Sequence, residues 1–224
     1  MIKIGAITIG QSPRVDLMPD MEKIFMDSIE VIQMGGLDGL TKDEIETFTP
    51  QGPDDHVLVS RLRDGSSVTF GESHVLPRMQ DCIAALEAQG VSLILFLCTG
   101  EFPEDFRSNV PLIFPNRILT SVVPAAMPGC RLAVFTPSEA QTAQVTNKWL
   151  RASAGAVSVI PVSPYNGMDP VLKAAETICP DEIDMIVMDC IGYTVEMKEK
   201  IHAMTGKPVV LPRTLVARMI NELV

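Results

Sequence analysis

Basic residues are scarce in this chain, and it has no long hydrophobic run. Its 18 Lys and Arg residues against 28 Asp and Glu residues give a net charge of −10. Nucleic-acid binding and peripheral membrane anchoring usually require basic patches, so this balance argues against both. No segment approaches the roughly 18 consecutive apolar residues of a membrane helix, and no signal peptide is recognisable. We therefore predict a protein that binds neither nucleic acid nor a membrane.

Motifs for disulfides, metals and nucleotides are also missing. The five cysteines are odd in number and lack CxxC spacing, which predicts reduced thiols in a cytoplasm. The three histidines form no metal-ligand spacing with them, so no metal site is expected. The chain lacks GxGxxG and a serine nucleophile elbow, and Gln11 stands where a phosphate loop would need lysine. We therefore expect no cofactor.

The order of segments predicts an α/β fold. With 224 residues, 46% of them apolar, the chain can form one large domain or two small ones. Strand-like runs are expected at Lys3–Ile9, Glu30–Met34, Leu93–Leu97, Pro111–Phe114, Arg131–Phe135, Val157–Val162, Met185–Met188 and Val209–Leu211. Helices are expected at Asp16–Met26, His74–Gln89, Ser138–Arg151, Asp169–Ile178, Thr194–Met204 and Thr214–Leu223. Helices between strands imply crossovers, and hence mostly parallel sheets with flanking helices.

The element order divides the chain into two pseudo-symmetric halves. The first spans residues 1–115 and the second residues 116–211, while a last helix over 212–224 is expected to pack on the first half. His56–Leu62 and Ser67–Phe70 flank Asp64-Gly65 and predict a β-hairpin inserted in the first half. Thr41 with Glu44, and Ser138 with Gln141, are capping-box signatures.

Cys98 and Cys190 are the most informative residues. Each ends an apolar run and is followed two residues later by a glycine, Gly100 or Gly192. Ligand sites in open α/β folds lie where parallel strands end, so two thiols at matched positions are expected to face one pocket. A helix starting after each thiol would favour the thiolate. The alternative is that both are packing residues, which is our interpretation of Cys82, Cys130 and Cys179.

Several residues at strand-to-helix turns are candidates for binding an anion. Arginine can hold a carboxylate with two parallel hydrogen bonds, and hydroxyls at helix starts can accept or donate. The alternatives are a solvated helix cap for Arg14, interdomain ion pairs for Arg117 and Arg213, and helix capping for Thr136 and Ser138. The predicted substrate-binding set is Ser12, Arg14, Thr99, Gly100, Arg117, Thr136, Ser138, Gly192 and Arg213.

Three segments carry a family resemblance that extends over essentially the whole chain. They are Thr8-Ile9-Gly10-Gln11-Ser12-Pro13-Arg14, Pro115-Asn116-Arg117-Ile118-Leu119 and Asp189-Cys190-Ile191-Gly192-Tyr193. With these segments the chain resembles the AroM family, which is in turn remotely similar to the aspartate/glutamate racemase superfamily. The second resemblance implies two pseudo-symmetric α/β halves, each supplying one cysteine to a shared cleft.

The chain departs from the racemase pattern at three places. Thr99 follows Cys98 directly, where amino-acid racemases usually have Cys-Asn-Thr. Gly10-Gln11-Ser12-Pro13 replaces an Asp-Ser-Gly turn, and Ile191-Gly192-Tyr193 stands where many have a histidine. The usual helpers of thiol deprotonation are therefore absent or replaced.

We hypothesise a cofactor-independent racemase, isomerase or decarboxylase of a small carboxylate. Cys98 and Cys190 would be its acid/base pair, because inversion at carbon needs one group on each face. The alternative is a non-catalytic sensor or regulatory protein that binds a small carboxylate in the same cleft. The sequence leaves homo-oligomer formation open.

Overall fold

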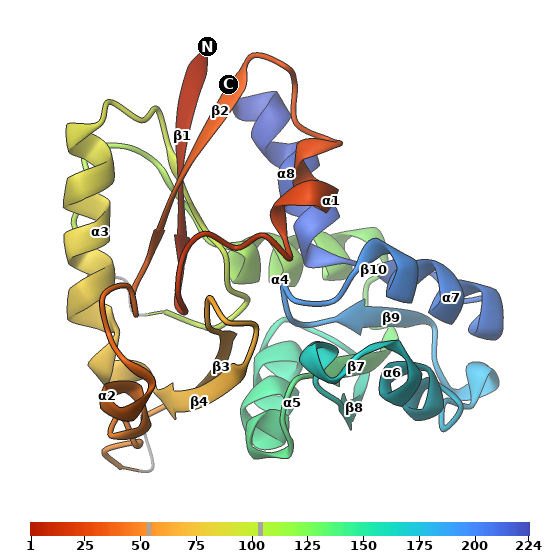
Figure 1. Cartoon of the computed structure of the whole chain (residues 1–224). Coiled ribbons are helices and arrows are strands. Elements are labelled where there is room, and N and C mark those ends of the chain that lie inside the picture. Colours follow the sequence, from red (N-terminus) through yellow and green to blue (C-terminus); the bar gives the residue numbers. More distant parts are fainter. Residues whose placement is uncertain (53–54, 103–104) are drawn as a thin grey trace.

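Two four-stranded parallel sheets form the framework of the protein, as the computed structural model shows for residues 1–52, 55–102 and 105–224 (Figure 1). The first sheet has the order β2-β1-β5-β6. Its strands are β1 (Ile2–Thr8), β2 (Ile29–Gly35), β5 (Ile94–Phe96) and β6 (Leu112–Ile113). The second sheet contains β7 (Arg131–Thr136), β8 (Ala156–Pro161), β9 (Met185–Met188) and β10 (Val209–Val210).

The two sheets share one topology. From one edge to the other, the second sheet has the order β8-β7-β9-β10. These strands occupy the positions of β2, β1, β5 and β6 in the first sheet. In both, the first strand of the half lies between the second and the third. Cys98 follows the third strand of one sheet and Cys190 the third strand of the other. The predicted pseudo-symmetry is therefore confirmed at the level of strand order.

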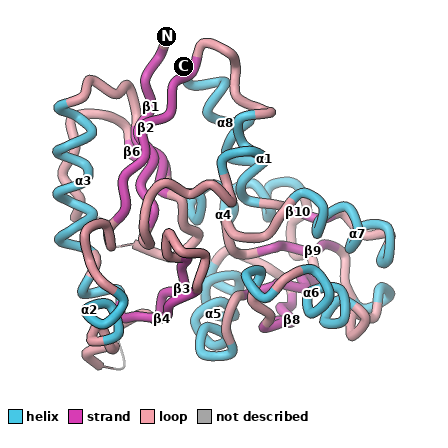
Figure 2. The backbone as a smooth tube through the Cα atoms, in the orientation of Figure 1, coloured by secondary structure: helices cyan, strands magenta, loops and turns pink. Residues whose placement is uncertain are grey.

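Helices cover both faces of each sheet (Figures 1 and 2). The helices are α1 (Met18–Glu22), α2 (Lys42–Glu46), α3 (Leu76–Ala88), α4 (Pro115–Ala126), α5 (Thr142–Arg151), α6 (Met168–Ala175), α7 (Val195–Thr205) and α8 (Pro212–Leu223). Single 3₁₀ turns are η1 (Glu72–His74), η2 (Glu139–Gln141), η3 (Pro164–Asn166) and η4 (Pro180–Glu182). The AroM-like sequence thus folds as the predicted α/β protein.

The predicted hairpin is present between α2 and η1. Its strands β3 (Val57–Arg61) and β4 (Ser67–Gly71) pair antiparallel, with Val57 opposite Gly71 and Arg61 opposite Ser67. Gly65 in the turn has φ +87°, a conformation that favours glycine. Leu58 and Phe70 are buried in the core that α3 forms with the first sheet, so the hairpin is anchored to the first half.

Two helices carry the chain between the halves. On the second sheet, Leu119 and Val123 of α4 pack in the same core as Val134 and Val187. At the other end of the chain, α8 returns to the first sheet, where its apolar side chains share a core with β1, β5 and α1. The members of α8 in that core are Val216, Ala217 and Ile220.

Some predicted boundaries were wrong. The first helix is limited to Met18–Glu22 instead of Asp16–Met26, because the chain must turn back before β2 begins at Ile29. The Thr41–Glu44 capping box is confirmed. The box predicted from Ser138 and Gln141 is not formed.

Different hydrogen bonds replace the predicted Ser138–Gln141 capping box at the start of α5. Ser138 accepts a hydrogen bond from the backbone of a 3₁₀ turn, whereas the Gln141 amide reaches the carbonyl of Val57 at 3.0 Å. The regular helix therefore starts at Thr142.

Within the described ranges, no helix combines the length and apolar character needed to cross a bilayer.

Truncating a buried residue of α8 should destabilise the protein, whereas truncating an exposed one should not. Ile220 is fully buried and Leu223 is 52% exposed on the same helix. We expect Ile220→Ala to lower the free energy of unfolding by about 2–5 kcal/mol through lost burial and a residual cavity. Leu223→Ala should change it by less than about 0.5 kcal/mol. Urea denaturation measures both, and equal effects would contradict the packing of α8 on the first sheet.

Candidate active site

Cys98 and Cys190 occupy equivalent turns in the two halves. Cys98 follows β5 after one intervening residue, and Cys190 follows β9 in the same way. In each turn the glycine two residues further on donates its backbone N–H to the sulfur. Gly100 reaches Cys98 Sγ at 3.3 Å, and Gly192 reaches Cys190 Sγ at 3.4 Å. The matched strand order therefore produces matched surroundings for the two thiols.

Both cysteines line one cavity between the two halves. Its volume is about 40 Å³, room for a few water molecules and far below the roughly 300 Å³ of an open ligand pocket. The structure thus shows this site in a closed form. The wall comes from the hairpin, from the ends of β5, β7 and β9, and from α5. It consists of Ile9, Arg14, Leu58, Val59, Ser60, Leu97, Cys98, Thr99, Gly100, Thr136, Pro137, Gln141, Gln144, Val145, Lys148, Tyr165, Asp189, Cys190 and Ile191.

The residues predicted for the site divide into two groups. Those that line the cavity are Cys98, Cys190, Arg14, Thr99, Gly100 and Thr136. Those that lie outside its wall are Ser12, Arg117, Ser138, Gly192 and Arg213.

The residues outside the wall have other contacts. The Ser12 hydroxyl donates to Asp38 at 2.5 Å, and the Ser138 hydroxyl caps η2. Arg117 is exposed, with its guanidinium carbon 4.5 Å from the centroid of the Phe114 ring. Ser12 therefore joins the first turn to the segment after β2, and Ser138 serves as a helix cap.

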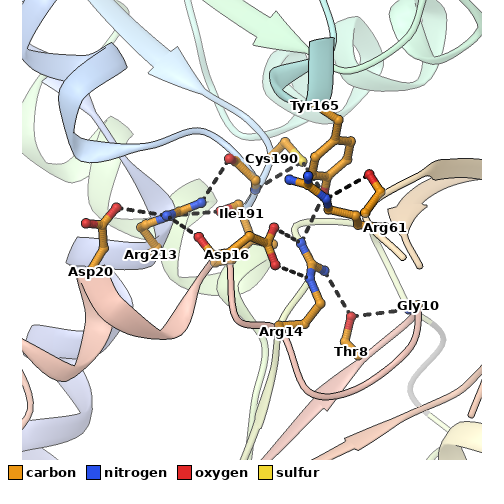
Figure 3. Close-up of polar contacts among 12 residues, drawn as sticks. Thr8, Gly10, Arg14, Asp16, Asp20, Arg61, Tyr165, Cys190, Ile191 and Arg213 are labelled. Carbon is orange, nitrogen blue, oxygen red and sulfur yellow. Dashed lines mark hydrogen bonds and ion pairs between the residues drawn. The ribbon is translucent and has the colours of Figure 1, made fainter. Parts of the chain in front are cut away.

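Arg213 fixes the turn that carries Cys190. It is 1% exposed, and it donates to the carbonyl of Ile191 at 3.0 Å and to that of Gly192 at 2.9 Å. Its remaining nitrogen pairs with Asp20 of α1 at 2.8 Å (Figure 3). Arg213 therefore holds the second thiol turn against the first half.

Arg14 brings a buried cation to the cavity wall. It is 2% exposed and forms an ion pair with Asp16 at 2.8 Å. It also donates to the Thr8 hydroxyl at 3.1 Å and to the Tyr165 hydroxyl at 3.3 Å (Figure 3). Burial tends to lower the pKa of the guanidinium, but the hydrogen bonds with Asp16 outweigh it and raise that pKa above its usual range. Arg14 therefore stays charged.

Tyr165 of η3 lies between the first half and the second thiol. Its hydroxyl is 4.0 Å from Cys190 Sγ, and the guanidiniums of Arg14 and Arg61 lie 5.9 and 5.8 Å from its ring centroid. A Cβ at Gly192 would be 2.8 Å from the ring, so glycine is required there. Burial raises the pKa of the phenol, which keeps it neutral and able to donate to sulfur.

A buried polar network joins the two thiol turns. Lys148 of α5 is 5% exposed, and its Nζ lies 2.5 Å from Asp189 Oδ2 and 3.2 Å from the carbonyl of Thr99. The same Asp189 oxygen accepts from Trp149 Nε1 at 2.7 Å. The Thr99 hydroxyl donates to the Asp189 carbonyl at 3.0 Å. Because Thr99 follows Cys98 and Asp189 precedes Cys190, this network sets the turns relative to each other.

Sequence reasoning missed the most important polar residues of the wall. Asp189 offered a signal, because a carboxylate at the end of a buried strand needs a partner. Lys148 lies on the helix expected at Ser138–Arg151, and nothing in the sequence distinguishes it from an ordinary surface lysine. Tyr165 gave no signal, since it precedes Cys190 by 25 residues and joins it only in the folded state.

The expected stabilisation of both thiolates by helix starts was wrong. Among the described residues, a loop follows Cys98 and the next helix is α4, while α7 begins only at Val195. Burial raises the pKa of Cys98 to about 12 and that of Cys190 above its usual range. The N–H groups of Gly100 and Gly192 oppose this effect without cancelling it. Both thiols are therefore protonated at neutral pH in this closed form.

The order in which the cysteines are alkylated should follow the exposure of their side chains, not whether they lie in the candidate site. Cys179 is exposed, whereas Cys190 is buried and Cys98 partly so. With iodoacetamide at neutral pH we expect Cys179 to react first, because its sulfur is open to the reagent, whereas burial raises the pKa of Cys98 and Cys190. Mass spectrometry of peptides gives the order. Buried Cys82 reports global unfolding as the control. Labelling of Cys98 as fast as Cys179 at neutral pH would contradict the raised pKa.

Removing the Lys148 cation should destabilise the whole chain. Lys148→Met leaves the Asp189 carboxylate buried without its cation, and we expect a loss of about 3–5 kcal/mol in the free energy of unfolding. Lys200→Met is the matched control, since Lys200 pairs with Glu196 at the surface and should contribute less than about 0.5 kcal/mol. Guanidinium denaturation compares the two variants. Similar small losses would show that the buried pair does not hold the turns.

Comparison with solved structures defines the class of fold. The aspartate racemase of Picrophilus torridus aligns with a TM-score of 0.64 at 16% identity, over 100% of this chain and 94% of that one. The maleate isomerase Iso of Pseudomonas putida S16 gives 0.65 at 16% identity, over 99% and 92%. The allantoin racemase of Klebsiella pneumoniae gives 0.62 at 14% identity, over 100% and 87%. The fold is therefore that of the aspartate/glutamate racemase-like proteins.

The family assignment follows from the sequence over nearly its whole length. Residues 4–224 match the family described as AroM protein, and the chain belongs to this family. A comparison with curated proteins finds no match.

Proposed function

We propose that this protein is a cofactor-independent enzyme that acts on a small carboxylate, by racemisation, isomerisation or decarboxylation. One observation carries the proposal: the two cysteines end equivalent strands and line the same cavity together with Arg14 and Lys148. Arg14 and Lys148 come from opposite halves and are paired with Asp16 and Asp189, and in our proposal they also contact the anionic ligand. Two thiols suit proton transfer on opposite faces of a carbon. Structural neighbours named as racemases and a maleate isomerase support this class.

The surroundings of the thiols support different roles for them. Burial raises the pKa of both, and Asp189 adds to this at Cys190 and Glu72 at Cys98. The N–H of Gly192, the cation of Arg14 and the Tyr165 hydroxyl lower the pKa of Cys190, whereas the N–H of Gly100 and the cation of Lys148 lower that of Cys98. Because more groups favour a thiolate at Cys190, we take it as the base. In our proposal Cys190 removes the proton next to the substrate carboxylate, and the Cys98 thiol delivers its own proton to the opposite face.

Arg14 and Lys148 would stabilise the charge that develops during this step. Removal of the proton moves negative charge onto the carboxylate, and fixed cations in a site without bulk water stabilise that charge strongly. Thr99 and Thr136 offer hydroxyls at the same wall. All five cysteines are free, which fits our proposal that the protein works in a cytoplasm.

A non-catalytic sensor of small carboxylates is the second candidate. The raised pKa of both thiols favours it, because a thiol that stays protonated is a poor base. A sensor would use Arg14 and Lys148 for binding alone, and its cysteines would be dispensable for ligand affinity and for any response.

Exchange of substrate hydrogen with solvent separates the two functions. Candidate mono- and dicarboxylates are incubated in deuterated water, and NMR follows label uptake at the carbon next to the carboxylate. We expect uptake with a true substrate. Cys98→Ser and Cys190→Ser should each abolish inversion while leaving binding within roughly tenfold, or about 1.4 kcal/mol. Exposed Cys179→Ser is the control with unchanged activity. No label uptake with any ligand that binds, together with equal binding by both cysteine variants, would favour the sensor.

A further inference from the structure

A second hollow lies beside the thiol cavity. It is a groove of about 740 Å³, within the size range of small-molecule sites. Its walls come from the segment leading into β3, from η1 and α3, from the loop after β5, and from α5 of the second half, which faces the hairpin in Figure 1. The lining residues that matter for its chemistry are Asp55, His56, Glu72, Glu101, Asn147 and Arg151.

The groove and the cavity are neighbours along the chain and in space. Gln144 lines both of them. Val57 lines the groove, and the next residue, Leu58, lines the cavity. Likewise, Glu101 lines the groove, and the residue before it, Gly100, lines the cavity. The two hollows therefore share part of their walls, and the groove is next to any ligand whose reacting end lies in the small cavity.

The two hollows differ in charge. Arg14 and Lys148 line the cavity together with Asp189, which pairs with Lys148, whereas in the groove the carboxylates of Asp55, Glu72 and Glu101 outnumber the cation of Arg151. Two of the groove carboxylates already have partners. Glu101 pairs with Arg151 at 2.7 Å, and Asp55 accepts hydrogen bonds from the hydroxyl and the backbone of Ser73.

Glu72 is the groove carboxylate that is least satisfied. It is 7% exposed, and its Oε2 lies 3.3 Å from His56 Nδ1. Its Oε1 is buried and has no hydrogen-bond partner among the residues that the structure describes. Burial, together with the charges of Asp55 and Glu101, raises the pKa of Glu72 to about 7. A buried acceptor without a donor costs free energy that a ligand donor can offset.

We propose that the groove binds the distal end of the ligand whose carboxylate occupies the thiol cavity, and that Glu72 accepts an ammonium group or a similar cationic donor there. The ligand class is thus a zwitterion with its carboxylate and its amine at opposite ends. The assignment of the carboxylate end rests on the proposed function, whereas the amine end rests on the groove alone. A dicarboxylate fits poorly, since its second carboxylate would meet Asp55, Glu72 and Glu101.

Calorimetric titration with matched ligands tests this proposal. γ-Aminobutyrate, δ-aminovalerate and ε-aminocaproate are compared with butyrate, valerate and caproate, with glutarate, and with butylamine. About one pH unit above the pKa of Glu72, the best amino acid should bind about tenfold tighter than the carboxylate of the same length. Glutarate should bind no tighter than valerate.

Glu72→Gln should remove this tenfold difference and leave the affinity for the plain carboxylates unchanged. Exposed Glu176→Gln, outside the groove, is the matched control and should keep the difference. In the wild-type protein the difference should also shrink about one unit below the pKa, because protonated Glu72 no longer attracts a cation. This pH series is first measured on the wild-type protein. Other titratable groups lie near Glu72, namely His56, Asp55, Glu101 and Cys98. Repeating the series with Glu72→Gln shows which part of the pH dependence comes from Glu72 itself.

The outcomes separate the two proposals. Equal binding of amino acids and plain carboxylates, or a difference that persists in Glu72→Gln, would overturn the groove assignment. Butylamine binding that depends on Glu72, without binding of any carboxylate, would uphold the groove and overturn the proposed function.

Discussion

The buried ion pair between Lys148 and Asp189 is the interaction on which the site depends. Taking two charges out of water is costly, and the cost is met only when geometry and additional hydrogen bonds are good. Here Trp149 and the Thr99 carbonyl supply those bonds. These bonds all reach Lys148 or Asp189 Oδ2, while Asp189 Oδ1 is buried with no hydrogen-bond partner among the described residues. Because Thr99 and Asp189 are direct neighbours of the two cysteines, the same network also fixes where the thiols lie.

The same burial determines how the thiols can react. A closed cavity raises the pKa of both, so a thiolate depends on the groups placed around each sulfur. Arg14, Tyr165 and the N–H of Gly192 lower the pKa of Cys190, whereas Lys148 and the N–H of Gly100 lower that of Cys98. The pseudo-symmetric fold thus surrounds its two thiols with different groups.

The crossing of the chain between the halves supports this arrangement. Helix α4 leaves the first sheet for the second, and α8 returns at the end of the chain. Arg213 sits at the start of α8 and binds both the Cys190 turn and Asp20 of α1. The Cys190 turn is consequently tied to the first half through Arg213 as well as to its own sheet.

The sequence by itself determined the α/β class, the hairpin, the element order that places Cys98 and Cys190 at matched positions in the two halves, and the family. These follow from local periodicity, turn residues and contiguous motifs, which a linear chain displays directly. Only the tertiary structure decided that Arg14 and Lys148 line the cavity, whereas Arg117 and Arg213 do not. It also placed Tyr165 beside Cys190, and Glu72 in the groove. These positions depend on contacts between residues distant in sequence and on burial, neither of which has a periodic pattern in the chain.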